Sequence, residues 1–226
     1  VTNTAGITGT PTASRMLYLQ PTAANDAPVF SGLDNTPTFI QNGSAIVLDP
    51  NALLSDPELD LFGASGNWNG AILTLQRDGG ANANDVFGFT GSGDSGVNVS
   101  SGNLRIGTTV VGTFTNTGGT LTISFNANAT QARVNEVLSS IGYANTSDAP
   151  PASVQVGWSF SDGNTGSQGS GGALTAAGST TVNITAVNDA PTITGLPGSA
   201  QAVTAGAAAA LADFAVADAD GAAASL

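Results

Sequence analysis

The chain contains no cysteine, no histidine and no lysine among its 226 residues. Without cysteine, neither a disulfide framework nor a thiolate metal site can form. The side chains that most often act as bases or nucleophiles near neutral pH are therefore missing. A glycosidase needs only two carboxylates, but just two Trp and two Tyr are present to stack on sugars. We expect that the protein is not an enzyme.

Positive charge is also scarce. Four arginines stand against 16 acidic residues, which gives a net charge of −12. Such a chain repels nucleic-acid phosphates and anionic lipids, so we expect no nucleic-acid partner. No apolar run approaches the roughly 18 residues that a membrane span requires. The natural small partner of this composition is a hard cation, which takes oxygen ligands.

Short runs of alternating apolar and polar residues dominate the sequence. This period of two, rich in β-branched residues, predicts half-buried strands, and Gly, Asn, Asp and Pro at the run ends predict turns. The predicted strands lie at 14–21, 71–77, 98–107, 108–115, 119–126, 152–162 and 178–187, with two more around an Asn-Gly turn within 37–48. The sequence therefore predicts an all-β fold.

One segment, 128–143, has helical periodicity instead. Its apolar stripe consists of Val134, Val137, Leu138 and Ile141. Thr130 or Asn128 can cap the start, and Gly142 stands where a left-handed residue would end the helix. The stripe predicts a short helix that closes one end of the β-structure by core packing.

The tetrapeptide Asn-Asp-Ala-Pro occurs twice, at 25–28 and at 188–191. An acidic cluster follows each copy, with Asp56 lying 31 residues after Asn25 and Asp218 lying 30 residues after Asn188. Two matches in the same order and register indicate an internal repeat.

The repeat predicts three units. We interpret 1–24 as the C-terminal strand of one repeat, 25–187 as a complete repeat and 188–226 as the start of the following one. The chain starts at Val1 and stops at Leu226 within this pattern, so we expect it to be a segment of a longer protein.

The stretches "WSFSDGNTGSQG", "STTVNITAVNDAP" and "VADADG" resemble the cadherin-like and VCBS-type tandem repeats of giant bacterial surface proteins. Many of those are repeats-in-toxin adhesins secreted by the type I route. The resemblance implies an immunoglobulin/cadherin-like antiparallel β-sandwich, here with one short helix and flanked by parts of neighbouring repeats. It also implies an extracellular or cell-surface location. The complete unit is longer than the ~100 residues of a typical immunoglobulin domain, and we place the extra material around 63–127.

The acidic clusters are the candidate metal sites. "SDPELD" places carboxylates at alternate positions, and Ca²⁺ takes six to eight oxygen ligands. In cadherin-like modules the linker Asn-Asp and the following acidic pair bind calcium together. The resemblance therefore implies two ligand sets: Asp26 with Asp56, Glu58 and Asp60, and Asp189 with Asp218 and Asp220. The alternative is that these residues only form turns, which is our interpretation of Asp78, Asp85 and Asp162.

These observations lead to three alternative predictions of function. The leading prediction is a structural repeat of an extracellular bacterial adhesin or matrix protein, stiffened by Ca²⁺ and partnered by neighbouring repeats. The second is a filament subunit that self-associates, because 14–24 and 192–226 offer unpaired strands to another chain. The third is a module that binds a glycan or surface ligand through Trp68, which lies between Gly and Asn residues and is expected to be exposed. Trp158 is expected in the core.

Overall fold

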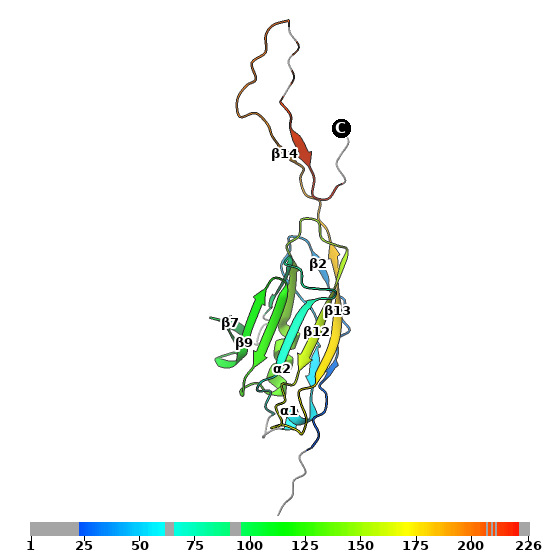
Figure 1. Cartoon of the computed structure of the whole chain (residues 1–226), viewed down its shortest axis with the longest axis vertical. Coiled ribbons are helices and arrows are strands. Elements are labelled where there is room, and N and C mark those ends of the chain that lie inside the picture. The colour runs from blue at the N-terminus through cyan, green and yellow to red at the C-terminus, as the bar shows by residue number, and fades with distance from the viewer. Residues whose placement is uncertain are drawn as a thin grey trace, which may run out of the picture.

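The computed structural model describes residues 23–61, 66–90, 96–206, 208, 210 and 212–221 (Figure 1). The predicted strand at 14–21 lies outside these residues. The strands are β1 (Val29–Ser31), β2 (Thr38–Ile40), β3 (Ile46–Val47), β4 (Leu53–Ser55), β5 (Ile72–Arg77), β6 (Asp85–Phe89), β7 (Val97–Ser100), β8 (Asn103–Ile106), β9 (Thr109–Thr117), β10 (Thr120–Phe125), β11 (Ile141–Asn145), β12 (Ser153–Ser161), β13 (Thr175–Thr185), β14 (Thr192–Thr194) and β15 (Ala215–Ala217). The helices are α1 (Pro57–Leu61) and α2 (Gln131–Ser140).

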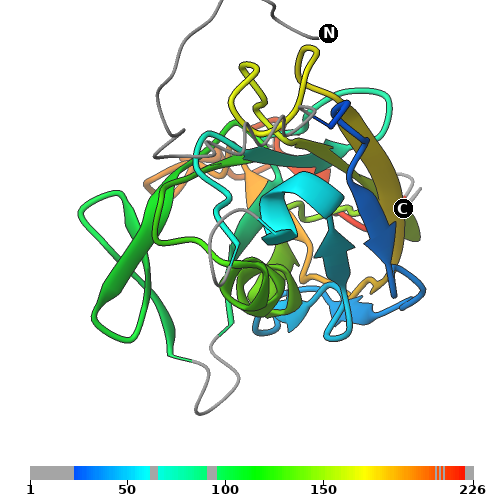
Figure 2. The same ribbon diagram turned by 90° about the horizontal axis from the view of Figure 1, so that it is seen from below.

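The largest element is an eight-stranded sheet with the order β2-β13-β12-β5-β10-β9-β8-β7. Adjacent strands of this sheet pair antiparallel, except that β13 and β2 run parallel. Seen from one end, this sheet arches over α2 and two smaller sheets, β3-β11-β6 and β1-β4 (Figure 2). The prediction of an all-β sandwich is confirmed. Strands β5 and β10 come from the segment 63–127, yet they lie in the middle of the large sheet.

The core lies between the sheets and contains both tryptophans. Trp158 is 1% exposed, and its indole Nε1 donates to Thr180 Oγ1 at 3.1 Å. Trp68 is fully buried and packs edge-on against Phe160, with ring centroids 5.5 Å apart. The prediction that Trp68 is exposed is therefore wrong. The Gly and Asn residues around Trp68 do predict a turn, but the turn directs the large indole ring into the core and not toward solvent.

Helix α2 is shorter than the segment predicted for it. Thr130 is the N-cap, and its side chain accepts from Arg133 N at 3.4 Å. The helix ends at Ser140, because Ile141 and Gly142 already belong to β11 and pair with β6. The residues Val134, Val137, Leu138 and Ile141 are all buried, as the stripe predicts.

A partly buried ion pair fixes β5 to the smaller sheet β3-β11-β6. The Arg77 guanidinium donates to both Asp85 carboxylate oxygens at 2.8 Å. Asp85 Oδ1 also accepts from Tyr143 Oη at 2.6 Å and from Asn145 Nδ2 at 2.9 Å. Asp85 is 2% exposed, so its role extends well beyond the turn formation that its sequence context suggests.

A β-hairpin of β14 and β15 projects from the end of the sandwich where β13 finishes (Figure 1). All six residues of its two strands are exposed. No helix in the described part of the chain has the length and apolar character needed to cross a membrane.

Candidate cation sites at two acidic junctions

The first acidic junction lies where the linker 23–26 meets the sandwich. Asp56 is the N-cap of α1, because its Oδ1 accepts from Glu58 N at 3.0 Å and Leu59 N at 2.9 Å. Pro57 follows at the first helical position, where a missing N–H has no cost. The motif "SDPELD", read from sequence as a loop, is thus a capped helical turn.

The other Asp56 oxygen, Oδ2, has no hydrogen-bond partner within the part of the chain that the structure describes, although Asp56 is fully buried. Burial raises the pKa of Asp56 to about 6, against the hydrogen bond from Leu59 N, and the Asp162 and Glu58 carboxylates raise it further. A buried acceptor that faces two other carboxylates is poorly satisfied by protein alone. A bound cation would supply the missing partner.

Two linker residues are held on this acidic group. The backbone N–H of Asp26 donates to Glu58 Oε2 at 3.0 Å, and the Asn25 side-chain amide donates to Asp162 Oδ2 at 2.6 Å. The Asn25 backbone N–H also donates to Ser170 O at 3.0 Å. The linker, α1 and the loop that precedes β13 therefore converge at one point.

The prediction from sequence did not include Asp162 as a ligand. Asp162 is fully buried, and its carboxylate accepts from Asn164 N at 2.9 Å and Leu174 N at 3.1 Å. These bonds are the turn chemistry that the sequence suggested. The structure adds that the same carboxylate faces Asp56 across 106 residues of chain, a proximity that sequence spacing does not reveal.

Gln168 is a second residue that the sequence prediction missed. Its Oε1 is buried and has no hydrogen-bond partner among the described residues. Gln168 lines a pocket of about 280 Å³ together with Ala23, Pro57, Glu58 and Leu61. Among the described residues, Asp56 Oδ2 and Gln168 Oε1 thus give the first junction one carboxylate oxygen and one amide oxygen that are buried and lack a partner.

Asp60 faces a different direction from the rest of the set. Its Oδ2 accepts from Asp56 N at 3.1 Å and from Gln131 Nε2 at 2.8 Å. Burial raises the pKa of Asp60, and the Asp56 N–H and the Trp68 indole N–H act against that rise. Asp60 Oδ1 and the indole Nε1 are both buried, and neither makes a hydrogen bond of standard geometry to any residue that the structure describes. Asp60 therefore ties α1 to α2 and to the core.

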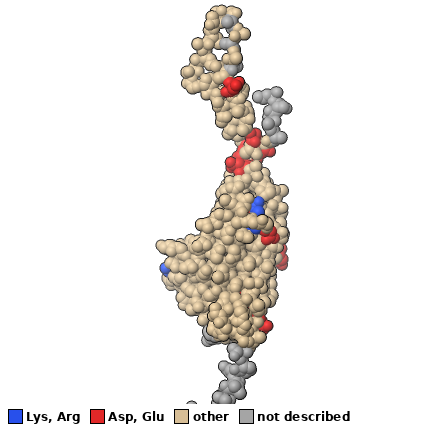
Figure 3. Space-filling model, in the orientation of Figure 1, with Lys and Arg blue, Asp and Glu red and all other residues tan. Residues whose placement is uncertain are grey.

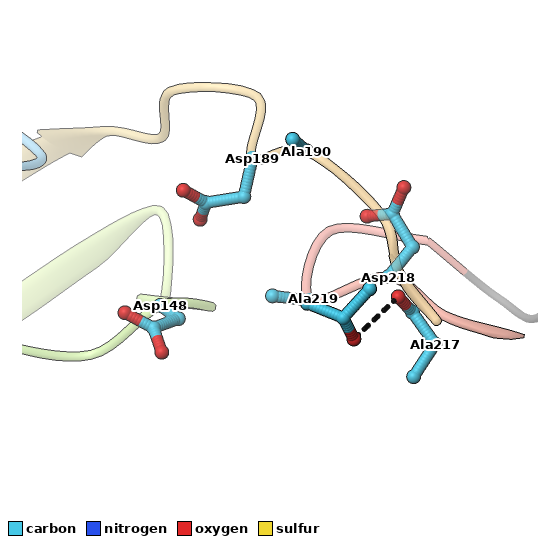
Figure 4. Close-up of a pocket in the computed structure, with 7 residues that line it drawn as sticks. Asp148, Asp189, Ala190, Ala217, Asp218 and Ala219 are labelled. Carbon is cyan, nitrogen blue, oxygen red and sulfur yellow. Dashed lines mark hydrogen bonds between the residues drawn. The ribbon is translucent and has the colours of Figure 1, made fainter. Parts of the chain in front are cut away.

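The second acidic junction lies between the sandwich and the projecting hairpin. The Asp189 backbone N–H donates to the Asp220 carboxylate, and Asp220 N donates to Asp218 Oδ1 at 3.0 Å. Asp148, Asp189 and Asp218 line a pocket of about 420 Å³. In the close-up, Asp148 and Asp189 lie on one side of this pocket and Asp218 lies across from them (Figure 4).

Gln41 anchors this second junction to the sandwich. It is 2% exposed. Its Nε2 donates to Asp148 O at 2.9 Å and to Asp189 Oδ2 at 3.3 Å, and its Oε1 accepts from Val187 N at 2.8 Å. One buried amide thus orients both the linker and a nominated ligand.

The two junctions repeat the same backbone arrangement. The linker residues Asp26 and Asp189 each donate a backbone N–H to a carboxylate, that of Glu58 in the first junction and that of Asp220 in the second. Each accepting residue in turn donates its own N–H at 3.0 Å to the Oδ1 of the aspartate two positions earlier.

The two-stranded antiparallel sheets beside the junctions, β1-β4 and β14-β15, also match. Three residues after the linker aspartate, Val29 pairs with Ser55 in the first sheet and Thr192 pairs with Ala217 in the second. Each first strand is followed by a glycine at positive φ, Gly32 at +71° and Gly195 at +81°. The match in sequence is therefore longer than the tetrapeptide Asn-Asp-Ala-Pro, and it extends over "NDAPVFSGL" and "NDAPTITGL".

Within the described residues, no group of three or more His, Cys, Asp and Glu side chains is placed to hold a metal ion by itself. A cation at the first junction would therefore need amide or carbonyl oxygens as well as carboxylates, as Ca²⁺ accepts. The two unpartnered oxygens fit that requirement.

No protein-family model, no curated protein and no solved structure matches the chain. The resemblance to cadherin-like repeats therefore stays a prediction, and the case for function depends on the geometry of the junctions.

Proposed function

We propose that the chain is a structural tandem-repeat module of an extracellular bacterial adhesin or matrix protein, stiffened by Ca²⁺ at its junctions. The observation that carries the proposal is the duplicated junction, in which the backbone N–H of a linker aspartate donates to an acidic turn beside a two-stranded antiparallel sheet. At the first copy, a buried carboxylate oxygen has no hydrogen-bond partner among the described residues.

Ca²⁺ at the first junction would be held by Asp56 and Asp162, with Glu58 and the amide oxygen of Gln168 nearby. Asp26 would contribute through the linker and Asp60 through the orientation of α1. At the second junction, Asp189, Asp218 and Asp220 would serve with Asp148. The ion would neutralise clustered negative charge and fix the linker to the body. Extracellular modules bind calcium with a Kd of roughly 10⁻⁴–10⁻³ M, which suits a location outside the cell.

Thermal melting with a calcium titration, beside a mass-spectrometric metal count, tests this proposal. Calcium at about 100 times its Kd adds roughly 2.7 kcal/mol to the free energy of unfolding. For a chain of this size the expected rise in Tm is roughly 5–10 °C. Asp56→Asn should remove most of the rise, whereas Asp213→Asn, at an exposed hairpin residue, should keep it. Identical melts in calcium and in chelator, with no metal counted, would overturn the proposal.

A second candidate function is a filament that forms by exchange of hairpins between chains. Four large side chains of the projecting hairpin are exposed: Ile193 at 54%, Leu196 at 63%, Phe214 at 51% and Val216 at 40%. In the matching two-stranded sheet β1-β4, Phe30 packs edge-on against Trp158 with ring centroids 6.3 Å apart, and Leu54 is 1% exposed. In the filament, β14-β15 of one chain would bury its apolar side chains in the corresponding place of a second copy. Light scattering decides, since a monomer that persists at millimolar concentration contradicts the filament.

A further inference from the structure

The outer face of the eight-stranded sheet is rich in small hydroxyl side chains. The register places two rows side by side across β9, β10, β5, β12 and β13: Thr115, Thr122, Thr74, Ser159 and Ala177, then Thr117, Thr120, Gln76, Gly157 and Ser179. Figure 3 views the molecule from this side, and few charged atoms lie over the strands. The face is polar and nearly neutral.

A hollow of about 450 Å³ interrupts this face over β5, β12 and β13. Its rim carries Thr74, Gln76, Asp78 and Ser159, and its floor includes Gly157 and Ala177. The hollow exists because the two floor residues are small while their cross-strand neighbours are larger. It is about the volume of a small-molecule site.

Gly157 is the unusual residue of this floor. A glycine inside a strand weakens the strand and often marks the close approach of another group. The φ of Gly157 is not positive, so its backbone conformation does not require glycine. A Cβ at this position would clash with Asp78 Oδ1. The absent side chain therefore lets the Asp78 carboxylate lie down over the sheet.

The Asp78 carboxylate lies at the hollow, and Asp78 is exposed. Its backbone N–H is used, because it donates to Gln155 O at 2.9 Å. Among the described residues, no group donates a hydrogen bond to its side chain, and the salt bridge in this region joins Arg77 to Asp85 instead. A carboxylate, an amide and two hydroxyls thus converge on an open, polar space.

We propose that this hollow binds a neutral saccharide unit, with the Asp78 carboxylate accepting from two adjacent sugar hydroxyls. Thr74, Gln76 and Ser159 provide further donors and acceptors, and the C–H face of the ring lies on Gly157 and Ala177. An anionic ligand is disfavoured by the net charge of −12. A cationic ligand would use Asp78 but leave the hydroxyls of the rim without complementary groups.

The expected affinity is weak, with a Kd on the order of 1 mM, because the site is open and offers no exposed aromatic ring. Many such sites along a repeated chain would gain strength by multivalency. This proposal is independent of calcium, so the failure of one leaves the other standing.

The test is a ¹H–¹⁵N NMR titration of the calcium-saturated full chain with methyl glycosides of glucose, galactose, mannose and N-acetylglucosamine, each up to about 50 mM. At least one glycoside should shift amides of β5, β12 and β13 around the hollow. Asp78→Asn should weaken that binding by about tenfold, since hydrogen bonds to charged groups are the stronger ones.

Two further variants keep the test decisive. Gly157→Ala should displace the carboxylate and abolish the shifts, with retained folding checked by its melting curve. Thr115→Val, on the same face but on β9, should bind as the unchanged chain does. No shift with any of the four glycosides, or equal binding by Asp78→Asn, would overturn the proposal. Shifts confined to amides away from Asp78 and these three strands would also overturn it.

Discussion

At the scale of single residues, the molecule satisfies some buried carboxylates fully and leaves others short of partners. Asp85 accepts four hydrogen bonds from the Arg77, Tyr143 and Asn145 side chains. Asp56 accepts two from backbone N–H groups on one oxygen and, among the described residues, none on the other. The contrast separates a carboxylate that holds the fold together from one that the proposed cation would satisfy.

The satisfied network should respond strongly to deletion of a partner. Tyr143→Phe removes a buried hydrogen bond to a carboxylate, so we expect the free energy of unfolding to fall by about 1.5–3 kcal/mol. Asp85→Asn should cost more, about 3–5 kcal/mol, because Arg77 would lose its counter-ion. Urea denaturation measures both, and the double variant gives their coupling. Additive effects would show that the two residues act separately.

Asp56 should make stability depend on pH. Its pKa in the folded chain is about 6 and its ordinary value is 3.8, so between these values the folded state binds more protons than the unfolded state. Its stabilising contribution is therefore complete below pH 4 and is lost as the pH rises through 6. In chelator, Tm should rise as the pH falls from 7 to 5.

Calcium should reverse this dependence, because Asp56 must be ionised to bind the ion. The increase in Tm that calcium produces should shrink as the pH falls through 6. In chelator, Asp56→Asn should remove the part of the pH dependence of Tm that comes from Asp56. If the melting profiles of this variant and the unchanged chain run parallel in chelator from pH 7 to 5, Asp56 does not titrate as described.

At the scale of elements, the long strands were predictable, whereas among the short ones β2 and β3 were predicted from the Asn-Gly turn between them and β1 and β4 were not. β5, β9, β10, β12 and β13 have six to eleven residues, long enough for alternation to stand out. β1 and β4 have three residues each, and β11 begins directly where α2 ends. In these places tertiary packing decides the conformation, and local pattern carries too little information.

The candidate site was only half predictable for the same reason. Asp56 and Glu58 are neighbours in the sequence, so their clustering is visible there. Asp162 and Gln168 reach them only through the fold, because the loop before β13 returns to the end of the sandwich where the linker enters. The "SDGNTG" stretch predicts a turn, but it does not indicate that this turn lies beside Asp56.

The two-stranded sheet β1-β4 depends on α2 for one of its backbone hydrogen bonds. Leu54 N donates to the Asn135 side-chain Oδ1 at 2.8 Å. Asn135→Ala would leave this N–H without its partner, and we expect a loss of about 1–3 kcal/mol. Amide hydrogen exchange should accelerate at Leu54 while the centre of β12 stays protected. Unchanged exchange at Leu54 would contradict this role of Asn135.

At the scale of the whole molecule, the two junctions lie at opposite ends of the sandwich. At the second junction, Gln41 holds the linker through which the chain leaves the sandwich. Gln41→Met keeps the volume but removes the bonds to Val187, Asp148 and Asp189. The hairpin β14-β15 should then reorient more freely, which ¹⁵N relaxation would report as faster tumbling relative to the body. Equal tumbling rates in both proteins would show that Gln41 does not set this orientation.

The parallel pairing of β2 with β13 has a mechanical consequence. β13 ends at the second junction, and β2 follows the first junction in the chain and points the same way along the sheet. When the two linkers are pulled apart, these strands are drawn in opposite directions along their length. Their hydrogen bonds are then loaded together in shear and do not open one by one. The sandwich is built to carry tension along its axis, so force spectroscopy should record a higher rupture force through the linkers than across the sheet.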